Sequence, residues 1–396
     1  MQVFCYNLIL VLKPLKEINI YKMRKLLSFL LITSICLCTL ASCGNSGDSV
    51  STKEDADKVA TVTETDAEAT PLITPSPTPS PTPTPIDLKD EVYETRYPSD
   101  AGALKVCGTQ LCDSEGTPVQ LRGVSTHGIQ WFPEYINEDL FKELKEEWGV
   151  NAVRLCLYTE ESEGYCEDGD KEALKDLICQ GVEYAKEADL YAIVDWHCMR
   201  DGDPTTHEDE ALLFFEEISE RLSGYDNVLY EICNEPNTVV WKVIKEYALN
   251  VIPKIRANDP DAVVIVGTPI YCKAPTEAKK DPITEYDNVM YSLHFYAASH
   301  KESIQVEVKG MADAGLPLFV SEFGICSNTG TGSLDIEWGD SWMDLLDEYG
   351  ISYMIWQLSN KHESSSLIKE ECTKTSGFTD DDLTEHALWY REHLKR

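Results

Sequence analysis

Residues 191–236 read YAIVDWHCMRDGDPTTHEDEALLFFEEISERLSGYDNVLYEICNEP. Two apolar runs, YAIVDWH and NVLYEICNEP, flank an amphipathic stretch from Glu208 to Ser223, which is the pattern of a strand, a helix and a second strand. Both runs are apolar almost throughout, as is typical of parallel strands that are buried on both faces. The first run ends in His197 and the second in Asn234 and Glu235. We therefore expect a parallel sheet whose polar side chains gather at the carboxyl ends of its strands.

The same unit recurs along residues 100–396. Further strands are expected at residues 119–126, 151–159, 262–269, 288–297, 317–324 and 351–359. Further helices are expected at residues 137–149, 171–189, 239–258, 304–314, 341–349 and 380–393, with no clear long helix between the strands at 262–269 and 288–297. Eight strands over this length favour one closed (β/α)8 TIM barrel of the α/β class, because closure leaves no sheet edge unpaired.

The chain before residue 100 has a different composition. Met23-Arg24-Lys25 precedes an apolar run ending in Leu40-Ala41-Ser42-Cys43, which resembles a bacterial lipoprotein signal. We expect residues 1–42 to be an upstream extension and signal peptide, with lipidation at Cys43; an ordinary signal peptide or a single spanning helix is the alternative. Residues 43–99 are acidic and then rich in Pro and Thr, which predicts a disordered linker. The expected location is extracellular, on the bacterial cell surface, with a lipid anchor as the membrane contact.

The charge balance narrows the choice of partners. Lys and Arg number 34 against 69 Asp and Glu, a formal net charge of −35. Because a chain this acidic repels phosphate backbones, we expect no nucleic acid partner. A neutral substrate suits the chain better. The sequence has no phosphate-binding, nucleotide-binding or haem signature, so we expect no cofactor. We also expect a monomer.

The 14 cysteines do not form a recognisable metal or redox motif. No pair has the Cys-x-x-Cys spacing of a zinc or thioredoxin-like site, and we expect no bound metal. We expect most of them to be reduced thiols, because they are spread singly along apolar segments. Cys156, Cys198, Cys233 and Cys326 belong to the expected core. Cys107 and Cys112 are the pair that can form a disulfide.

Two glutamates lie at or near the ends of strands four and seven, which are three places apart in the predicted barrel, so their side chains can meet across its mouth. Glu235 comes after the fourth strand, and Glu322 lies on the seventh. Paired carboxyls suit the hydrolysis of a glycosidic bond, in which one protonates the leaving oxygen and the other attacks or supports the anomeric carbon. A separation of about 5 to 5.5 Å indicates retention, and about 6.5 to 9.5 Å indicates inversion. Taken alone, Glu235 can also cap a helix that begins at Pro236, and Glu322 can be half of an ion pair.

Seven motifs together resemble a known family. They are QLRGVSTHGIQWFP, NAVRLCLYT, IVDWH, YEICNEPN, HFYA, FVSEFG and WQLSNKHESS, in this order over nearly the whole predicted barrel. The set resembles glycoside hydrolase family 5, and most closely its bacterial endoglucanase branch. The resemblance implies that Glu235 is the proton donor and later general base, and that Glu322 is the nucleophile of a retaining double displacement.

The resemblance also implies supporting roles. Arg154 is expected to keep Glu322 ionised, or else to form a structural ion pair. Asn234 suits the sugar 2-hydroxyl, Tyr296 can hydrogen-bond Glu322, and His294 can orient the donor side. Aromatic rings can stack on sugar faces, although core packing is the alternative for each of them. The expected substrate-binding residues are His127, Trp131, Phe132, Tyr158, His197, Tyr296, Trp356, Lys361 and Glu363.

Several functions are compatible with these sequence features. The leading one is an endo-β-1,4-glucanase acting on a β-glucan, with a mannanase, lichenase or xyloglucanase of the same family as the nearest alternatives. A second class is a metal-dependent barrel hydrolase using His127, His197 and His294, which the absence of His-x-His and His-Glu-x-x-His spacings weakens. A third is a sugar-binding lipoprotein without activity, and the presence of both glutamates argues against it.

Overall fold

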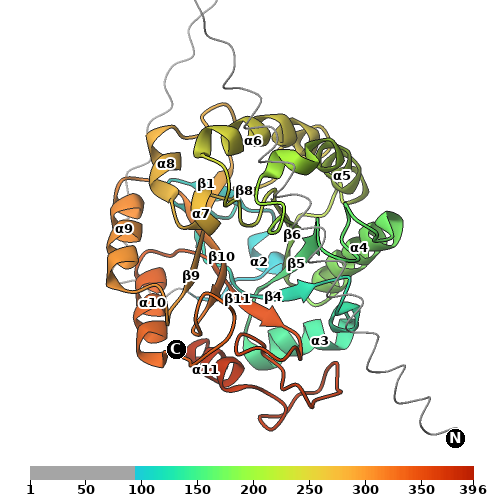
Figure 1. The fold of residues 1–396 in the computed structure, drawn as a ribbon, viewed down its shortest axis with the longest axis vertical. Coiled ribbons are helices and arrows are strands. Elements are labelled where there is room, and N and C mark those ends of the chain that lie inside the picture. The colour runs from blue at the N-terminus through green and yellow to red at the C-terminus, as the bar shows by residue number, and fades with distance from the viewer. Residues whose placement is uncertain (1–93) are drawn as a thin grey trace, which may run out of the picture. The chain divides into compact units, whose positions relative to one another are not determined.

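The computed structural model describes residues 94–396; the predicted signal peptide, Cys43 and the predicted linker up to residue 93 lie outside this range. Eight parallel strands form a closed barrel in the order β10-β11-β4-β5-β6-β7-β8-β9, ringed by helices (Figure 1). The predicted (β/α)8 barrel is confirmed. The barrel strands are β4 (Arg122–Gly128), β5 (Ala152–Tyr158), β6 (Tyr191–His197), β7 (Val228–Glu231), β8 (Val264–Val266), β9 (Val289–Tyr296), β10 (Leu318–Gly324) and β11 (Tyr353–Leu358).

The strands are apolar because helices cover the barrel outside and side chains fill it inside. Every residue of β5 and β6 is buried, and the two strands pair in register from Ala152 opposite Tyr191 to Tyr158 opposite His197. This register brings the carboxyl ends of neighbouring strands to one end of the barrel. The polar residues that the sequence places at those ends are therefore collected at one mouth.

The helices follow the predicted pattern with shifted ends. They are α2 (Pro98–Ala101), α3 (Glu138–Glu143), α4 (Lys171–Glu187), α5 (Glu208–Arg221), α6 (Trp241–Arg256), α7 (Pro269–Cys272), α8 (Pro275–Lys280), α9 (Glu302–Asp313), α10 (Ile336–Glu348) and α11 (Glu385–His393). The strand-to-strand link without a long helix contains α7 and α8. Helix α10 begins five residues before the predicted start because the Asp335 side chain caps it, accepting from Trp338 N at 3.2 Å. Helix α11 begins later than predicted, where Thr384 provides the cap.

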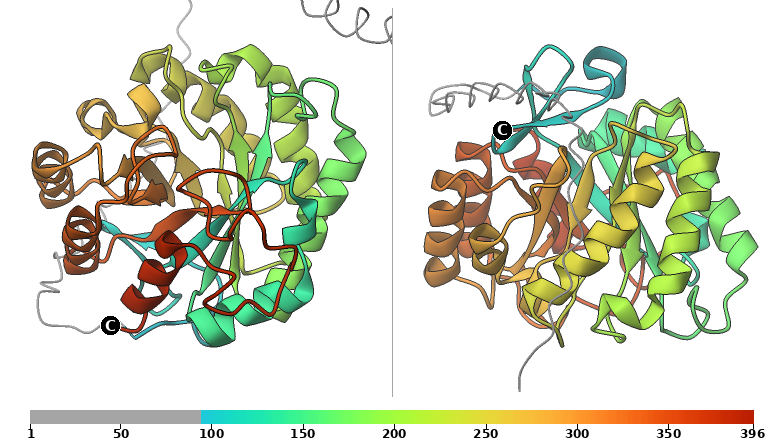
Figure 2. Two further views of the ribbon diagram at one scale, coloured as in Figure 1. Left: turned by 60° about the horizontal axis from the view of Figure 1, so that its bottom comes forward. Right: turned by 90° about the horizontal axis from the view of Figure 1, so that it is seen from above.

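A small antiparallel sheet lies across the amino end of the barrel (Figure 2). It consists of β1 (Lys105–Cys107), β2 (Gln110–Cys112) and β3 (Pro118–Val119). Leu104, Leu111 and Val119 belong to one buried cluster with Ala152 and Tyr191, the first residues of β5 and β6. The sheet therefore closes the end of the barrel opposite the polar mouth.

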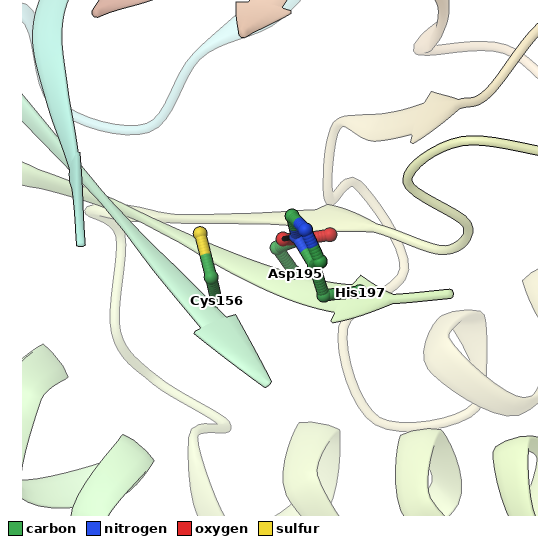
Figure 3. Close-up of side chains that lie close together, drawn as sticks. All are labelled: Cys156, Asp195 and His197. Carbon is green, nitrogen blue, oxygen red and sulfur yellow. Dashed lines mark hydrogen bonds and ion pairs between the residues drawn. The ribbon is translucent and has the colours of Figure 1, made fainter. Parts of the chain in front are cut away.

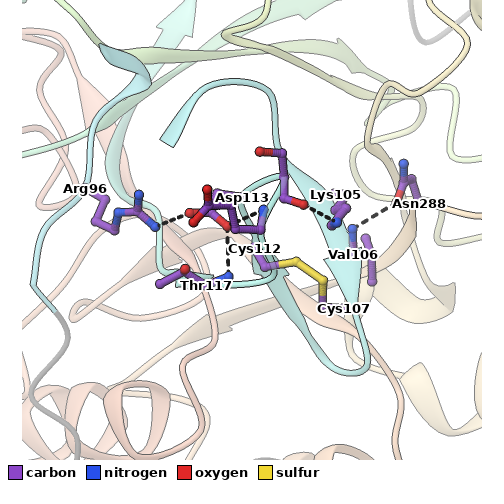
Figure 4. The surroundings of a disulfide bond; sticks show 10 residues. Arg96, Lys105, Val106, Cys107, Cys112, Asp113, Thr117 and Asn288 are labelled. Carbon is purple, nitrogen blue, oxygen red and sulfur yellow. Dashed lines mark hydrogen bonds and ion pairs between the residues drawn. A yellow bond between two sulfur atoms is a disulfide. The ribbon is translucent and has the colours of Figure 1, made fainter. Parts of the chain in front are cut away.

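Hydrogen bonds and a disulfide hold this sheet together (Figure 4). Cys107 and Cys112, the pair for which the sequence leaves a disulfide open, form one, with Cα atoms 6.0 Å apart. Asp113 accepts hydrogen bonds from Arg96 and from the backbone of Thr117, which lower its pKa to about 2. Val106 N donates to Asn288 Oδ1 at 2.9 Å. Arg96 bonds Asp113 of this sheet, and Ser99 separately bonds Asp189 just after the end of α4.

The remaining cysteines of residues 94–396 are free thiols. Cys156, Cys198, Cys233 and Cys326 are fully buried, which confirms their place in the core. No helix within residues 94–396 is long and apolar enough to cross a bilayer.

Candidate active site

A cavity of about 330 Å³ opens at the carboxyl ends of the barrel strands. Its lining includes both predicted catalytic glutamates and all but one of the predicted substrate-binding residues. The lining residues are His127, Trp131, Tyr158, Glu161, His197, Met199, Glu235, Tyr296, Glu322, Asn328, Thr329, Gly330, Trp356, Lys361 and Glu363. Phe132 is the exception: its ring packs against the main core and lies 5.1 Å from the His127 ring. Phe132 thus supports the position of His127.

The two glutamates meet in this cavity although 87 positions separate them in the sequence (322 − 235). Glu235 follows β7, whose last residue is Glu231, and Glu322 lies within β10. A carboxylate oxygen of Glu235 lies within 4.8 Å of one of Glu322, and a His294 ring nitrogen lies within the same distance of both. Because both carboxyls are buried, the pKa of each is raised to about 7. Two acids so close together cannot easily ionise together, so the pair holds one proton near neutral pH.

Neighbouring hydrogen-bond donors make the two acids unequal. Tyr296 Oη donates to Glu322 Oε1 at 2.7 Å, and Arg154 Nη1 lies 3.5 Å from Glu322 Oε2. Both donors favour the ionised form of Glu322. Glu235 instead faces His294, whose Nδ1 lies 2.9 Å from its Oε1. The arrangement therefore suits an ionised Glu322 beside a protonated Glu235.

Arg154 is shared among more partners than the sequence indicated. Its Nε lies 2.6 Å from Glu231 Oε2, and its Nη2 lies 3.0 Å from Asp195 Oδ2 and 2.7 Å from Asn234 Oδ1. Its contact with Glu322 is the longest of the four, and burial raises the pKa of Glu322 despite the guanidinium. Arg154 thus belongs to a buried ion-pair cluster and also lies near the candidate nucleophile, and its role in keeping Glu322 ionised stays a prediction.

Neither Asn234 nor His294 lines the cavity, and other buried groups occupy the polar atoms of both. The Asn234 amide donates to Cys198 O at 3.3 Å and lies 3.2 Å from His197 Nε2, while its oxygen accepts from Arg154. The residue is fully buried and does not line the cavity. His294 contacts Glu235 directly, at 2.9 Å, and its orienting role stays a prediction.

Cys156, Asp195 and His197 lie together on β5 and β6 (Figure 3), and His197 also lines the cavity. Asp195 Oδ2 lies 2.6 Å from His197 Nδ1, so it holds the imidazole by that nitrogen. Arg154 Nη1 lies 3.4 Å from the Cys156 sulfur, so a fixed positive charge already occupies this cluster. His127, His197 and His294, the ligands of the metal-dependent alternative, do not come together as one ligand group among the described residues. The geometry gives that alternative no support.

Aromatic rings line one side of the cavity. Trp131 and Tyr158 have ring centroids 4.8 Å apart, and the rings of His197 and Trp356 stack at 5.3 Å with an interplanar angle of 13°. Gly128 at the end of β4 permits this packing, since a Cβ there would lie 2.6 Å from the Trp131 ring. Flat apolar faces of this kind suit the C–H faces of a sugar ring.

Charged groups stand at the rim beside these rings. Lys361 Nζ lies 2.7 Å from Glu363 Oε1 and 3.1 Å from His127 Nε2. Burial lowers the pKa of His127 to about 3, with a further contribution from Lys361, so its imidazole is neutral. These groups offer both donors and acceptors for hydroxyls.

Sequence reasoning missed several residues of the site. Glu161 and Met199 follow β5 and β6 closely, so the strand-end rule that identified Tyr158 and His197 extends to them. Asn328, Thr329 and Gly330 come from the loop between β10 and α10, whose path no local pattern specifies. Asp195 and Glu231 lie inside quoted motifs, but only the structure shows their contacts with Arg154.

Residues 112–362 match the family described as Cellulase (glycosyl hydrolase family 5). The chain belongs to glycosyl hydrolase family 5. Endoglucanase A from Butyrivibrio fibrisolvens is 42% identical over 299 residues, which cover 74% of this chain and 69% of that protein. An endoglucanase from Clostridium saccharobutylicum is 39% identical over 303 residues, covering 76% of this chain and 67% of the relative.

Solved structures agree with this family 5 assignment. The catalytic domain of endoglucanase Cel5A from Thermobifida fusca, in complex with cellotetraose, has a TM-score of 0.72 and 38% identity to this chain. The match covers 76% of this chain and 99% of that domain. The resemblance inferred from the seven motifs is thus confirmed, and the chain is a glycoside hydrolase with the barrel of its family.

Proposed function

We propose that this family 5 chain is a retaining endo-β-1,4-glucanase that cleaves internal bonds of cellulose and related β-glucans. The observation that carries the proposal is the approach of the Glu235 and Glu322 carboxylates to within 4.8 Å inside an aromatic-lined cavity. That approach fits the separation of about 5 to 5.5 Å typical of retaining enzymes. The wider separation of about 6.5 to 9.5 Å, which admits an attacking water, is typical of inverting enzymes.

The first half of the reaction forms a sugar ester on the enzyme. The ionised Glu322 attacks the anomeric carbon while Glu235 gives its proton to the leaving glycosidic oxygen. Tyr296 holds the Glu322 carboxylate by its hydroxyl, at 2.7 Å, and fixes the attacking group. The bond from the anomeric carbon to the leaving oxygen breaks as the bond to Glu322 forms, and the released chain end leaves as an alcohol.

The second half restores the enzyme. Glu235, now ionised, takes a proton from a water that attacks the anomeric carbon, and Glu322 leaves as a carboxylate. Two displacements at one carbon retain the configuration of the sugar. Glu235 thus alternates between acid and base, which a pKa of about 7 permits near neutral pH.

The cavity wall supports a glucan as the substrate. Trp131 and Trp356 offer ring faces for stacking, and Lys361 and Glu363 offer charged groups for hydroxyls. The relatives named above are endoglucanases, and the Thermobifida structure holds cellotetraose. Mannan, lichenan and xyloglucan differ from cellulose in one hydroxyl orientation, in linkage or in branching, so a substrate panel distinguishes them.

Replacement of either glutamate by glutamine tests the proposal. The wild-type protein should release reducing ends from carboxymethyl cellulose more readily than from mannan or xyloglucan. Glu235→Gln should lower the rate by about 10²- to 10⁴-fold on this substrate, because general acid and base catalysis is lost. Glu322→Gln should lose at least as much, because the nucleophile is removed.

An acid far from the site provides the control. Glu115 is exposed in the turn before β3, so Glu115→Gln should retain wild-type activity. Near-native activity in Glu235→Gln or Glu322→Gln would contradict the assignment of roles. A preference for mannan or xyloglucan would instead leave the mechanism standing and replace the substrate.

A further inference from the structure

A buried chain of hydrogen bonds runs away from the cavity behind Glu235. Glu235 Oε1 lies 2.9 Å from His294 Nδ1, and His294 Nε2 lies 3.0 Å from Ser321 Oγ. Ser321 Oγ in turn lies 2.6 Å from Glu231 Oε1, and Glu231 Oε2 lies 2.6 Å from Arg154 Nε. Ser321 and Glu231 are fully buried and do not line the cavity. They therefore act on the reaction only through their neighbours.

The direction of each bond follows from counting hydrogens. The Ser321 hydroxyl has one hydrogen and two lone pairs. Burial raises the pKa of Glu231, but the Arg154 guanidinium 2.6 Å from its Oε2 favours the carboxylate, which only accepts. The 2.6 Å approach of Ser321 Oγ to Glu231 Oε1 therefore places the Ser321 hydrogen between the two oxygens. Ser292 Oγ, also 2.6 Å from Ser321 Oγ, then donates to Ser321. Ser321 has no hydrogen left for His294, so His294 Nε2 must carry a hydrogen and donate it.

This assignment fixes the state of the other ring nitrogen. Burial lowers the pKa of His294, so its imidazole is neutral and carries a single N–H. With that hydrogen on Nε2, Nδ1 presents a lone pair to Glu235 Oε1. An ionised Glu235 would place an oxygen lone pair against the lone pair of His294 Nδ1, and the two would repel. A protonated Glu235 donates to it instead.

We propose that Ser321 and Glu231 are positioning residues that fix the tautomer of His294 and thereby hold the catalytic proton on Glu235. The inference rests on the proposed function, because it assigns Glu235 as the acid. It adds a reason why the proton stays on Glu235 rather than on Glu322, namely the orientation of one serine hydroxyl.

Other charged and titratable groups also face Glu235 and His294. They are Arg154 and Tyr158 of β5, Asp195 and His197 of β6, Glu231 of β7, Cys272 and Lys273 at the end of α7, Tyr296 of β9 and Glu322 of β10. A change at Ser321 removes none of these groups. A shift of the Glu235 pKa in a Ser321 variant is therefore due to the loss of the hydroxyl and of the His294 tautomer that it selects.

The central experiment compares Ser321→Ala with wild type by the pH profile of kcat/KM on a soluble cello-oligosaccharide. Without the hydroxyl, His294 is free to carry its hydrogen on Nδ1 and donate it to an ionised Glu235. That bond stabilises the charged acid, so the alkaline limb should move to lower pH by about one unit. Ser321→Thr keeps the hydroxyl and should restore the wild-type limb.

Two controls separate the tautomer from simple damage to the core. Ser292→Ala removes an equally buried hydroxyl 2.6 Å from Ser321 but leaves the hydrogen bonds from Glu231 through Ser321 to His294 in place, so its alkaline limb should match wild type.

The second control is a substrate, a dinitrophenyl β-cellobioside, whose leaving group needs no proton. On this substrate, kcat/KM of Ser321→Ala at alkaline pH should match wild type, whereas the oligosaccharide should lose about tenfold.

Glu231→Gln tests the same series of hydrogen bonds if Ser321→Ala does not fold. Arg154 Nε can bond only the amide oxygen, so the amide nitrogen faces Ser321 and reverses the direction of donation. Asp195→Asn removes a buried charge that also contacts Arg154 but does not touch Ser321. The alkaline limb of Glu231→Gln should therefore shift further than that of Asp195→Asn.

The outcomes are distinct. An unshifted alkaline limb in folded Ser321→Ala would overturn the inference. If Ser321→Ala does not fold, equal shifts in Glu231→Gln and Asp195→Asn would overturn it. In both cases wild-type glucanase activity leaves the proposed function intact. Absence of glucanase activity in the wild type would instead overturn the proposed function itself. A shift in Ser292→Ala as large as that in Ser321→Ala would also contradict the inference, because it would trace the effect to general repacking.

Discussion

At the scale of single residues, Glu235 and Glu322 differ in the hydrogens that their neighbours offer. Tyr296 and Arg154 point donors at Glu322, while Glu235 faces the ring of His294. Burial raises both carboxyl pKa values to about 7, so the pair titrates as a unit and its singly protonated form is the active one. The kcat/KM profile should therefore fall on both sides of its maximum.

Tyr296→Phe tests the donor at Glu322. Loss of the hydroxyl removes a hydrogen bond to the charged form of Glu322, so its pKa rises and the acidic limb of kcat/KM moves to higher pH by about one unit. Tyr247→Phe is the matched control, since its hydroxyl is equally buried but donates to Ile232 O, outside the cavity. An acidic limb that stays in place in Tyr296→Phe, or moves equally in both variants, would contradict this role.

At the scale of elements, the sheet of β1, β2 and β3 contributes to stability rather than to chemistry. Its apolar side chains pack against the amino ends of the barrel strands, at the end opposite the cavity. Loops at the carboxyl ends carry the functional groups, as in other TIM barrels. Changes in the two regions should thus have separable effects.

Leu111→Ala tests this separation. Leu111 of β2 is 1% exposed, so its truncation should lower the free energy of unfolding by about 2 to 4 kcal/mol, measured by denaturant titration. The value of kcat/KM at 25 °C should stay near wild type. Leu213→Ala, the same change at a 66% exposed position on α5, should alter stability by about 0.5 kcal/mol or less. A loss of kcat/KM in folded Leu111→Ala would show that the two ends are coupled.

At the scale of the whole molecule, the sequence predicts the fold and the centre of the site because both follow from periodic features. Strand ends in a parallel barrel meet at one mouth, which places Glu235 and Glu322 together without any knowledge of loops. The contacts of Arg154 cannot be predicted from the sequence, because the sharing of one guanidinium among several acids depends on side-chain positions that no local pattern specifies. The loop bearing Asn328 and Gly330 was missed for the same reason.

The central claim is that Glu322 attacks the sugar while Glu235 supplies the proton. A 2-deoxy-2-fluoro-β-cellobioside with a dinitrophenolate leaving group forms the ester quickly and hydrolyses it slowly, so the intermediate accumulates. Peptide mass spectrometry of the treated protein should find one sugar adduct, on the peptide that contains Glu322. An adduct on Glu235 or on another carboxyl, or hydrolysis of the unsubstituted substrate with inversion at the anomeric carbon, would contradict the account.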